Sequence, residues 1–317
     1  MKITWFFLGA LLNAIWAMSY PLSKQLLSEL SVSEVTAWRL VPSAILLMLT
    51  LKKAHLSKKI EWLDLLGITS MGLVGCLAAM GLQFLATQHT LSSNIALLVA
   101  LEPPIVAVMA ALFAGESITL RVILGIMVAI SGVALVSVNL DQVELFNKEY
   151  LLGNCVMLAA DFCYAYYTLS GKLLSRRGWG ASVLTSLPMA IAAVFWLIGM
   201  SLFSEPHVGR LGFFGIHDLK TFGQVFWISI VATAGGYFAW NFLIIRLNAR
   251  TLSLTLYLQP IFGGIFAKWI FKENLPALFW PGLFLVVSGV WLSEYPSRKT
   301  EFQKVQLPPD GPGENAG

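Results

Sequence analysis

Long apolar runs separated by short polar breaks fill this sequence almost from end to end. About ten runs of roughly 20 mostly apolar residues follow one another, and a helix needs about that length to cross the hydrocarbon core of a bilayer. Lipid cannot satisfy backbone N–H and C=O groups, so such runs must be helical, and they are too continuous for barrel strands. We therefore predict an all-α membrane protein with spans near residues 3–26, 33–51, 63–86, 91–114, 119–139, 150–173, 181–203, 222–245, 251–271 and 276–294.

The composition leaves little room for a soluble domain. Hydrophobic residues make up 57% of the chain and charged residues 12%, which is far more apolar than an ordinary globular protein. The first run imitates a signal peptide, but Asn13 and Trp16 interrupt its apolar core, so we expect it to be the first span. Residues 296–317 are rich in Pro, Gly and charge, and we expect a disordered tail there.

The positions of lysine and arginine predict the orientation in the membrane. With ten spans both termini share a side, and the side richer in Lys and Arg faces the cytoplasm. The N-terminal side holds fourteen: Lys2, Lys52, Lys53, Lys58, Lys59, Arg121, Lys172, Arg176, Arg177, Arg246, Arg250, Arg298, Lys299 and Lys304. The other side holds six: Lys24, Lys148, Arg210, Lys220, Lys268 and Lys272. We expect cytoplasmic termini in a bacterial inner (plasma) membrane, and we attribute the net charge of +4 to topology, not to nucleic-acid binding.

The two halves of the chain match when one is slid along the other. An offset of 157 positions pairs Pro103 with Pro260, Glu116 with Glu273, Gly125 with Gly282, and Ser131-Gly132-Val133 with Ser288-Gly289-Val290. An offset of 148 positions pairs Asn13 with Asp161, Trp16 with Tyr164, Tyr20 with Thr168, and Lys24 with Lys172. We predict a first repeat at 1–139, a connecting loop at 140–150, a second repeat at 151–295 and a tail at 296–317.

Each predicted repeat has five spans, and an odd number turns the second repeat upside down in the membrane. An inverted repeat whose halves exchange conformations has two related states that open to opposite faces. Prolines Pro103 and Pro260 would bend the fourth span of each half at matching positions, and we expect hinges there. The pattern therefore predicts transport by alternating access.

A half-pattern of a Pro-containing fourth span, a turn with Glu116 or Glu273, and "SGV" in the fifth span occurs twice. In this respect the chain resembles the EamA branch of the drug/metabolite transporter superfamily over about residues 5–294. The resemblance implies a ten-helix secondary transporter with a central cavity lined mainly by spans one, three, four, six, eight and nine, typically an exporter of amino acids or other small metabolites. One departure is Gln259, which precedes the second proline where many members of the family keep a glutamate.

Two carboxyl groups lie near the bilayer centre, where a charge costs about 2.5–3.5 kcal/mol, and an arginine lies in the outer part of span two. Glu102 and Asp161 fall midway along spans four and six. They either pair with neighbours and fix helix packing, or face a cavity and bind a cationic group or a proton. Arg39 in span two either extends to the surface or partners an acid or a substrate carboxylate.

Polar and aromatic residues recur every three or four positions in spans one and six, so each set lines one helical face. An aromatic stripe can also serve packing or an interface belt, but the amide and carboxyl groups at depth favour a cavity. The predicted cavity residues are Asn13, Trp16, Tyr20, Arg39, Gln83, Glu102, Asp161, Tyr164, Thr168, Tyr237, Trp240, Asn241, Tyr257 and Gln259. Such a cavity suits a small amphipathic zwitterion.

These patterns favour a secondary transporter that exports amino acids or related metabolites. The alternative is an uptake permease or exchanger for a nucleoside-like or methyl-donor metabolite. A membrane enzyme or a structural protein is less well supported, because no catalytic motif appears and a structural role leaves the cavity unexplained. No ATPase motif is present, so we expect gradients to drive transport, with protons as the candidate coupling ion. We expect no cofactor, no metal and no required second copy, and we expect Cys76, Cys155 and Cys163 to be packing residues.

Overall fold

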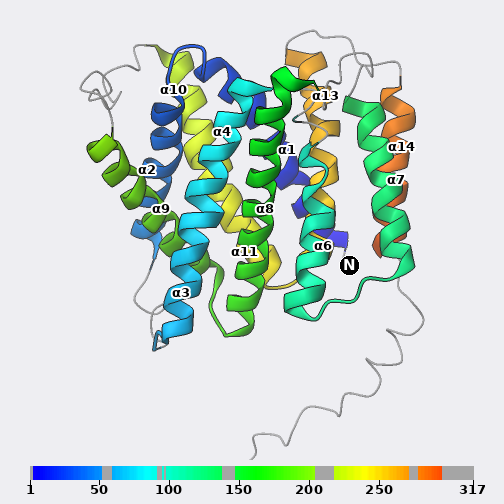
Figure 1. The fold of residues 1–317 in the computed structure, drawn as a ribbon, viewed down its shortest axis with the longest axis horizontal. Helices are drawn as coiled ribbons and strands as arrows, with labels where there is room; N and C mark the ends of the chain where they lie inside the picture. Colours follow the sequence, from blue (N-terminus) through cyan, green and yellow to red (C-terminus); the bar gives the residue numbers. More distant parts are fainter. Residues whose placement is uncertain are drawn as a thin grey trace, which may run out of the picture.

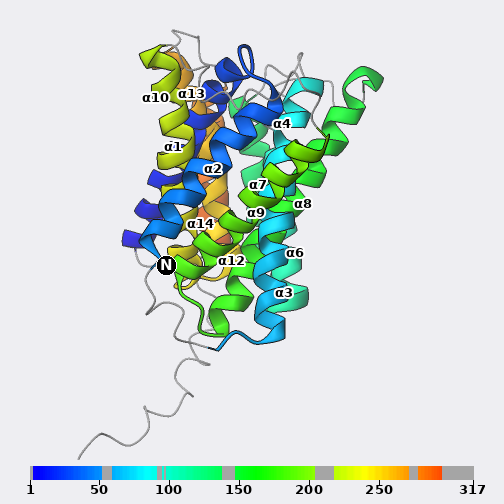
Figure 2. The same cartoon turned by 90° about the vertical axis from the view of Figure 1, so that its left-hand side faces the viewer.

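The computed structural model describes residues 3–51, 59–90, 95, 98–137, 147–203, 218–270 and 278–294. These ranges are almost entirely helical and contain no strand. The helices stand side by side in one bundle (Figure 1), and a second view shows the same arrangement from the side (Figure 2). The prediction of an all-α fold is confirmed.

The helical elements of each half follow the order of the apolar runs. The first half contains α1 (Ile3–Leu26), α2 (Val32–Thr50), α3 (Trp62–Ser70), η2 (Met71–Ala78), α4 (Ala79–His89), α6 (Glu102–Ala114) and α7 (Leu120–Ser137). The second half contains α8 (Lys148–Arg176), α9 (Ala181–Phe203), α10 (Leu219–Phe226), η5 (Trp227–Gly235), α11 (Gly236–Ile244), α12 (Ala249–Ser253), η6 (Leu254–Leu258), α13 (Gln259–Ile270) and α14 (Phe279–Glu294).

Several described stretches have the length and hydropathy of membrane spans. Four are long and apolar enough to cross a bilayer: Val32–Thr50, Trp62–His89, Ala181–Leu202 and Leu219–Ile244. Shorter apolar helices cover Phe7–Ser23, Glu102–Ala114, Leu120–Leu135 and Phe279–Ser293. The chain is therefore a membrane protein, and the exact number of ten spans stays a prediction. The predicted tail at 296–317 lies outside the described residues.

Local signals in the sequence explain where several helices begin and end. Ser31 and Glu34 form a capping box at the start of α2, in which each side chain bonds the backbone N–H of the other residue. Asp218 caps α10 by accepting from the backbone N–H of Thr221. Gly115 ends α6 at a φ of 66°, a left-handed conformation that glycine adopts without strain.

Helices α7 and α14 pack backbone against backbone (Figure 1). A Cβ added to Gly125 would lie 2.6 Å from the carbonyl oxygen of Gly289, and one added to Gly132 would lie 2.7 Å from that of Gly282. The early glycine of each helix thus meets the late glycine of the other, so the two helices run antiparallel. Two halves related by a pseudo-two-fold axis in the membrane plane produce reciprocal contacts of this kind.

The runs predicted as spans three and eight each contain a π-helical segment, η2 and η5. The 157-position offset carries η2 (Met71–Ala78) onto residues 228–235, which coincide with η5 (Trp227–Gly235) within one residue. A π segment adds a residue to the helical turn, and such segments occur frequently at functional sites. The two irregularities therefore lie at corresponding positions of the two halves.

The two predicted hinge prolines lie in the first turn of a helical piece, not in a helix interior. Pro103 follows Glu102, the first residue of α6, and Pro260 follows Gln259, the first residue of α13. A proline at this position removes no helical hydrogen bond. The apolar runs are thus interrupted just before each proline, by a turn before α6 and by the 3₁₀ segment η6 before α13. The hinge role itself stays a prediction.

Candidate functional site

A hydrogen-bonded polar group links four helices in the interior of the bundle. The Tyr164 hydroxyl on α8 donates to Oε1 of Gln83 on α4 at 2.9 Å. Arg39 on α2 donates from Nη1 to the same oxygen at 3.4 Å and from Nε to Oγ1 of Thr233 in η5 at 3.0 Å. The structure therefore brings together three residues predicted from the sequence and adds Thr233, which the sequence patterns did not single out.

The Arg39 guanidinium lies inside the bundle and does not extend to the surface. Arg39 is 9% exposed, and its guanidinium lies over the ring of Phe84 at 5.6 Å from the centroid. Its hydrogen-bond partners, Gln83 and Thr233, are neutral, and within the described part of the chain it forms no ion pair with a carboxylate. A buried guanidinium bonded only to neutral groups remains attractive to an anion, and its planar donors suit a carboxylate.

Two buried carboxyl groups complement this positive charge. Asp161 on α8 is fully buried, and among the described residues neither of its carboxyl oxygens has a hydrogen-bond partner. Glu102 is 8% exposed and interacts electrostatically with Asp161. Glu102 is also the first residue of α6, where the helix dipole favours negative charge. A buried carboxyl group without a partner is costly unless it takes up a proton or binds a cation.

Aromatic rings from spans one, six and eight form a wall in the same interior. The Trp16 ring lies 5.3 Å from that of Trp240 and 6.1 Å from that of Tyr237, measured between centroids. Tyr237 also contacts Tyr167 edge to face at 5.1 Å. The Trp240 indole donates to Oγ1 of Thr168 at 3.2 Å, which fixes its orientation. Tyr167 was missed by the sequence analysis, because it lies one position beside the predicted polar face of α8.

Other predicted residues are engaged in contacts between helices. The side-chain nitrogen of Asn241 donates to the Tyr167 hydroxyl and to Oγ1 of Thr185, among other acceptors. Asn241 therefore joins α11 to α8 and α9. Thr185 was also missed, because the sequence analysis assigned no cavity residue to the seventh span.

Asn13 and Gln259 pair with each other across the two halves. Gln259 Nε2 donates to Oδ1 of Asn13 at 2.9 Å, and Asn13 Nδ2 donates to Oγ1 of Thr255 at 2.9 Å. Tyr257 is buried, and among the described residues its hydroxyl has no hydrogen-bond partner. The side chain of Tyr20 lies outside the described residues.

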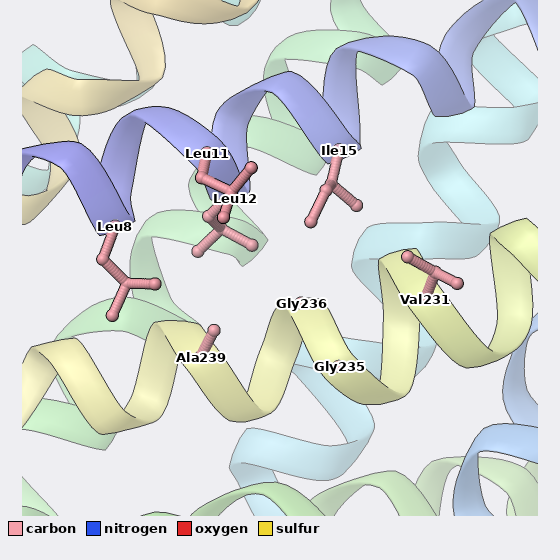
Figure 3. Close-up of a pocket in the computed structure, with 8 residues that line it drawn as sticks. All are labelled: Leu8, Leu11, Leu12, Ile15, Val231, Gly235, Gly236 and Ala239. Atoms are coloured by element: carbon pink, nitrogen blue, oxygen red, sulfur yellow. The ribbon is translucent and has the colours of Figure 1, made fainter.

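An apolar pocket of about 240 Å³ opens between α1 and the η5–α11 stretch (Figure 3). The α1 wall is aliphatic and consists of Leu8, Leu11, Leu12 and Ile15. The opposite wall consists of Val231, Gly235, Gly236 and Ala239, of which the two glycines have no side chain. Leu11 is exposed on the outer surface of α1, so the pocket continues the apolar surface of the bundle. It contains none of the charged residues described above.

The chain is similar to several transporters over most of its length. It is 27% identical to an uncharacterized transporter of Archaeoglobus fulgidus, with 90% of this chain and 95% of that one covered. It is 25% identical to a probable terminal-alkyne amino-acid exporter of Streptantibioticus cattleyicolor (87% and 89% covered) and 25% identical to the aromatic amino acid exporter YddG of Salmonella typhimurium (69% and 72% covered).

The fold also matches a solved crystal structure, with a TM-score of 0.72 over 94% of this chain and 98% of the other. At 16% identity this likeness shows the fold alone. The sequence pattern of the EamA-like transporter family matches the chain twice, at residues 3–138 and 151–295. The chain is thus a membrane protein that belongs to the EamA-like transporter family.

Proposed function

We propose that the protein is a secondary active transporter that exports amino acids or related small amphipathic metabolites by alternating access. The observation that carries this proposal is that opposite charges are buried near Tyr164 without pairing with each other, beside an aromatic wall. Arg39 lacks a carboxylate partner, and Asp161 lacks any hydrogen-bond partner, among the described residues. A zwitterion supplies both missing partners at once.

Each part of an amino acid has a matching group in this arrangement. The carboxylate accepts from the Arg39 guanidinium, and the ammonium group binds at Asp161 and Glu102. The apolar side chain packs against Trp16, Tyr237 and Trp240, whose rings also attract cationic groups. The printed names of two relatives, both amino acid exporters, support this substrate class.

Proton exchange at Glu102 and Asp161 would couple transport to a gradient. When the substrate ammonium leaves, the two carboxyl groups lose the cation that compensates them, and proton uptake restores neutrality. Gln259 takes the place of Glu102 in the second half, so an acid at this position belongs to the first half only. Pro103 and Pro260 would serve as hinges at the interruptions of spans four and nine.

The proposed setting is a bacterial inner membrane with both termini in the cytoplasm. Its partners are the lipid bilayer, the transported solute and protons, and a monomer suffices because the two halves enclose the site within one chain. Reporter fusions at the C-terminus and between the predicted spans 181–203 and 222–245 would report opposite sides of the membrane under this topology.

Reconstitution in liposomes tests the function directly. Labelled amino acids, nucleosides and methylated metabolites are offered with and without a proton gradient. We expect amino acids to move and the gradient to drive them. Uptake of a nucleoside-like or methyl-donor compound alone would favour the alternative permease, and movement of no solute under any gradient would overturn the proposal.

Substitutions at the charged groups test the assigned roles. Glu102→Gln and Asp161→Asn should each impair proton-driven transport, and Arg39→Gln should weaken the binding of amino acids while sparing analogues without a carboxylate. Ser186→Ala, a buried change away from the site, is the matched control. Unchanged rates and pH dependence in both acid variants would remove these residues from the coupling role.

A further inference from the structure

The π-helical segment η5 is fastened to the first half by three side-chain hydrogen bonds. The Trp16 indole on α1 donates to the carbonyl oxygen of Ala232 at 2.8 Å. The Ser43 hydroxyl on α2 lies 2.7 Å from the carbonyl oxygen of Ser229 and shares its proton with the carbonyl of Arg39. Arg39 Nε donates to Oγ1 of Thr233, as described above. We call these three contacts the fastening bonds.

Packing is sparse on the α1 side of η5, where the bond from Trp16 is the fastening bond. The apolar pocket lies there, between α1 and the glycines that end η5 (Figure 3). The Trp16 indole reaches the Ala232 carbonyl only because Gly236 has no side chain, since a Cβ there would lie 2.6 Å from the indole nitrogen. On this face, one hydrogen bond beside a pocket therefore holds η5, and the other two fastening bonds come from α2.

The corresponding segment η2 is held by close packing instead of side-chain hydrogen bonds. A Cβ added to Gly72 would lie 2.7 Å from the carbonyl oxygen of Pro188 on α9, and one added to Gly75 would lie 2.7 Å from Cβ of Tyr167 on α8. Within the described part of the chain, no side chain of another helix donates a hydrogen bond to η2. Close packing alone secures it.

The difference is already present in the aligned sequences. Trp16 aligns with Tyr164, which bonds Gln83 instead of a carbonyl of η2. Pro42 of α2 aligns with Pro188 of α9, which places Met189 opposite Ser43. A methionine donates no hydrogen bond, so the second half has no equivalent of the Ser43 contact.

We propose that Ser43 and Thr233, together with Trp16, are positioning residues of the transport cycle that hold η5 in the state seen in this structure. The proposal rests on the alternating-access function given above. When the two halves exchange conformations, η5 moves relative to α1 and α2, and the fastening bonds break. Their loss in a variant therefore lowers the population of this state relative to the opposite one.

Two further contacts join the halves at the end of the molecule where α6 meets α12. The Glu116 carboxylate, after α6, accepts from the backbone N–H groups of Ala249 and Arg250 at 2.8 and 3.2 Å. Arg176 of α8 donates to the carbonyl oxygen of Ala114. Ser253, one turn further along α12, is fully buried. A thiol at this position reports opening of that end.

The experiment measures how fast a membrane-impermeant thiol reagent modifies Ser253→Cys in a chain whose three native cysteines are replaced. Removing one fastening bond with Ser43→Ala should raise the modification rate about fivefold, because one buried hydrogen bond contributes about that factor to an equilibrium. The matched control is Ser186→Ala, since Ser186 is equally buried and donates to the carbonyl oxygen of Leu47 away from η5. The control should leave the rate unchanged.

A distance measurement separates a shift between two states from general loosening. Spin labels at Trp62→Cys and Leu120→Cys, both exposed, report the separation of α3 and α7. Ser43→Ala should increase the population of a second distance without moving either peak, whereas a loosened fold would broaden both. Thr233→Val, which removes the acceptor of Arg39, should act in the same direction and serves if Ser43→Ala fails to fold.

Two results would overturn the proposal. One is an unchanged modification rate in both Ser43→Ala and Thr233→Val. The other is a rise of the modification rate in Ser186→Ala equal to that in Ser43→Ala. Neither readout needs a transported solute. If no amino acid is transported but Ser43→Ala still shifts the two populations, the fastening role stands and only the substrate assignment falls.

Discussion

Two contacts between the halves differ sharply in how they are built. On one side of the bundle α7 and α14 meet through Gly125, Gly132 and Gly289, which we call the glycine interface, and an added Cβ at any of them would collide with the backbone of the partner helix. Near the centre, α1 meets η5 across a pocket and is joined to it by a hydrogen bond from Trp16. Both contacts lie in the apolar interior, so the surroundings do not explain the difference.

The difference indicates which contact stays fixed and which one parts. Close backbone packing gains dispersion energy from many atoms, and a gap of about 0.5–1 Å already forfeits about a quarter to a half of that energy. A few hydrogen bonds beside a pocket break at separate points and leave room for movement. We therefore interpret the glycine interface as the static part of the bundle and the α1–η5 contact as the moving part.

The largest expected effect comes from breaking the static contact. In Gly289→Leu the new Cβ would lie 2.5 Å from the nitrogen of Ala129 and from the carbonyl oxygen of Gly125. The helices must separate, and we expect a loss of more than about 3 kcal/mol of stability, seen as a large fall in Tm in detergent. Gly199→Leu is the control, because no atom lies within 4 Å of its added Cβ. Similar Tm values for the two variants would contradict the static interpretation.

Removing charge from the interior should act in the opposite direction on stability. Asp161 is buried without a hydrogen-bond partner among the described residues, so Asp161→Asn removes a group whose ionised form is costly there. We expect a rise of about 1 kcal/mol in stability together with loss of transport, a trade common at functional sites. A lower Tm in this variant would show that the carboxyl group stabilises the bundle.

The moving contact should show a functional effect with little change in stability. Gly236→Ala places a Cβ 2.6 Å from the Trp16 indole nitrogen and displaces the indole from Ala232, whereas Gly235→Ala meets only a backbone oxygen of its own helix, at 3.4 Å. Both gain helix propensity of up to about 1 kcal/mol. We expect a several-fold slower transport rate in Gly236→Ala and a normal rate in Gly235→Ala, with Tm near or above that of the parent in both. Equal transport rates would remove Trp16 from the moving contact.

The smallest effect concerns pH at the start of the helix that leads into η5. Hydrogen bonds from the backbone N–H and the hydroxyl of Thr221 hold the pKa of Asp218 below its usual value of 3.8. Its stabilising contribution is therefore complete above pH 3.8 and is lost as pH falls through the lower folded pKa. Circular dichroism between pH 6 and pH 2 should show slightly less acid loss of helix in Asp218→Asn than in the parent. Identical profiles would mean that the cap contributes nothing measurable.

The sequence predicted the symmetric features better than the individual contacts. Prolines and glycines that recur at a 157-position offset identified corresponding places in the two halves, and the structure places Pro103 and Pro260 in equivalent first turns. Such residues are informative because their backbone restrictions act locally and do not depend on neighbouring helices.

The rotation and register of the helices could not be predicted in the same way. Whether Arg39 extends to the surface or turns inward depends on partners such as Gln83, which lies in another helix. The π segments were missed because "MGLVGCLA" and "WISIVATAG" are as apolar as any regular span and carry no proline or charge. Tertiary contacts of other helices, which one sequence does not display, decide both features.

The unequal fastening of η2 and η5 also has a thermodynamic consequence. Two identical halves in inverted orientation would give the two end states equal free energy, so an empty carrier would rest in both equally. Three hydrogen bonds on one side only, at about 1 kcal/mol each, change that ratio on the order of a hundredfold. Under the proposed alternating access, the sequence difference between the halves sets the resting orientation of the empty protein, and each cycle returns through the less populated state. A bound solute or proton has to compensate for that difference.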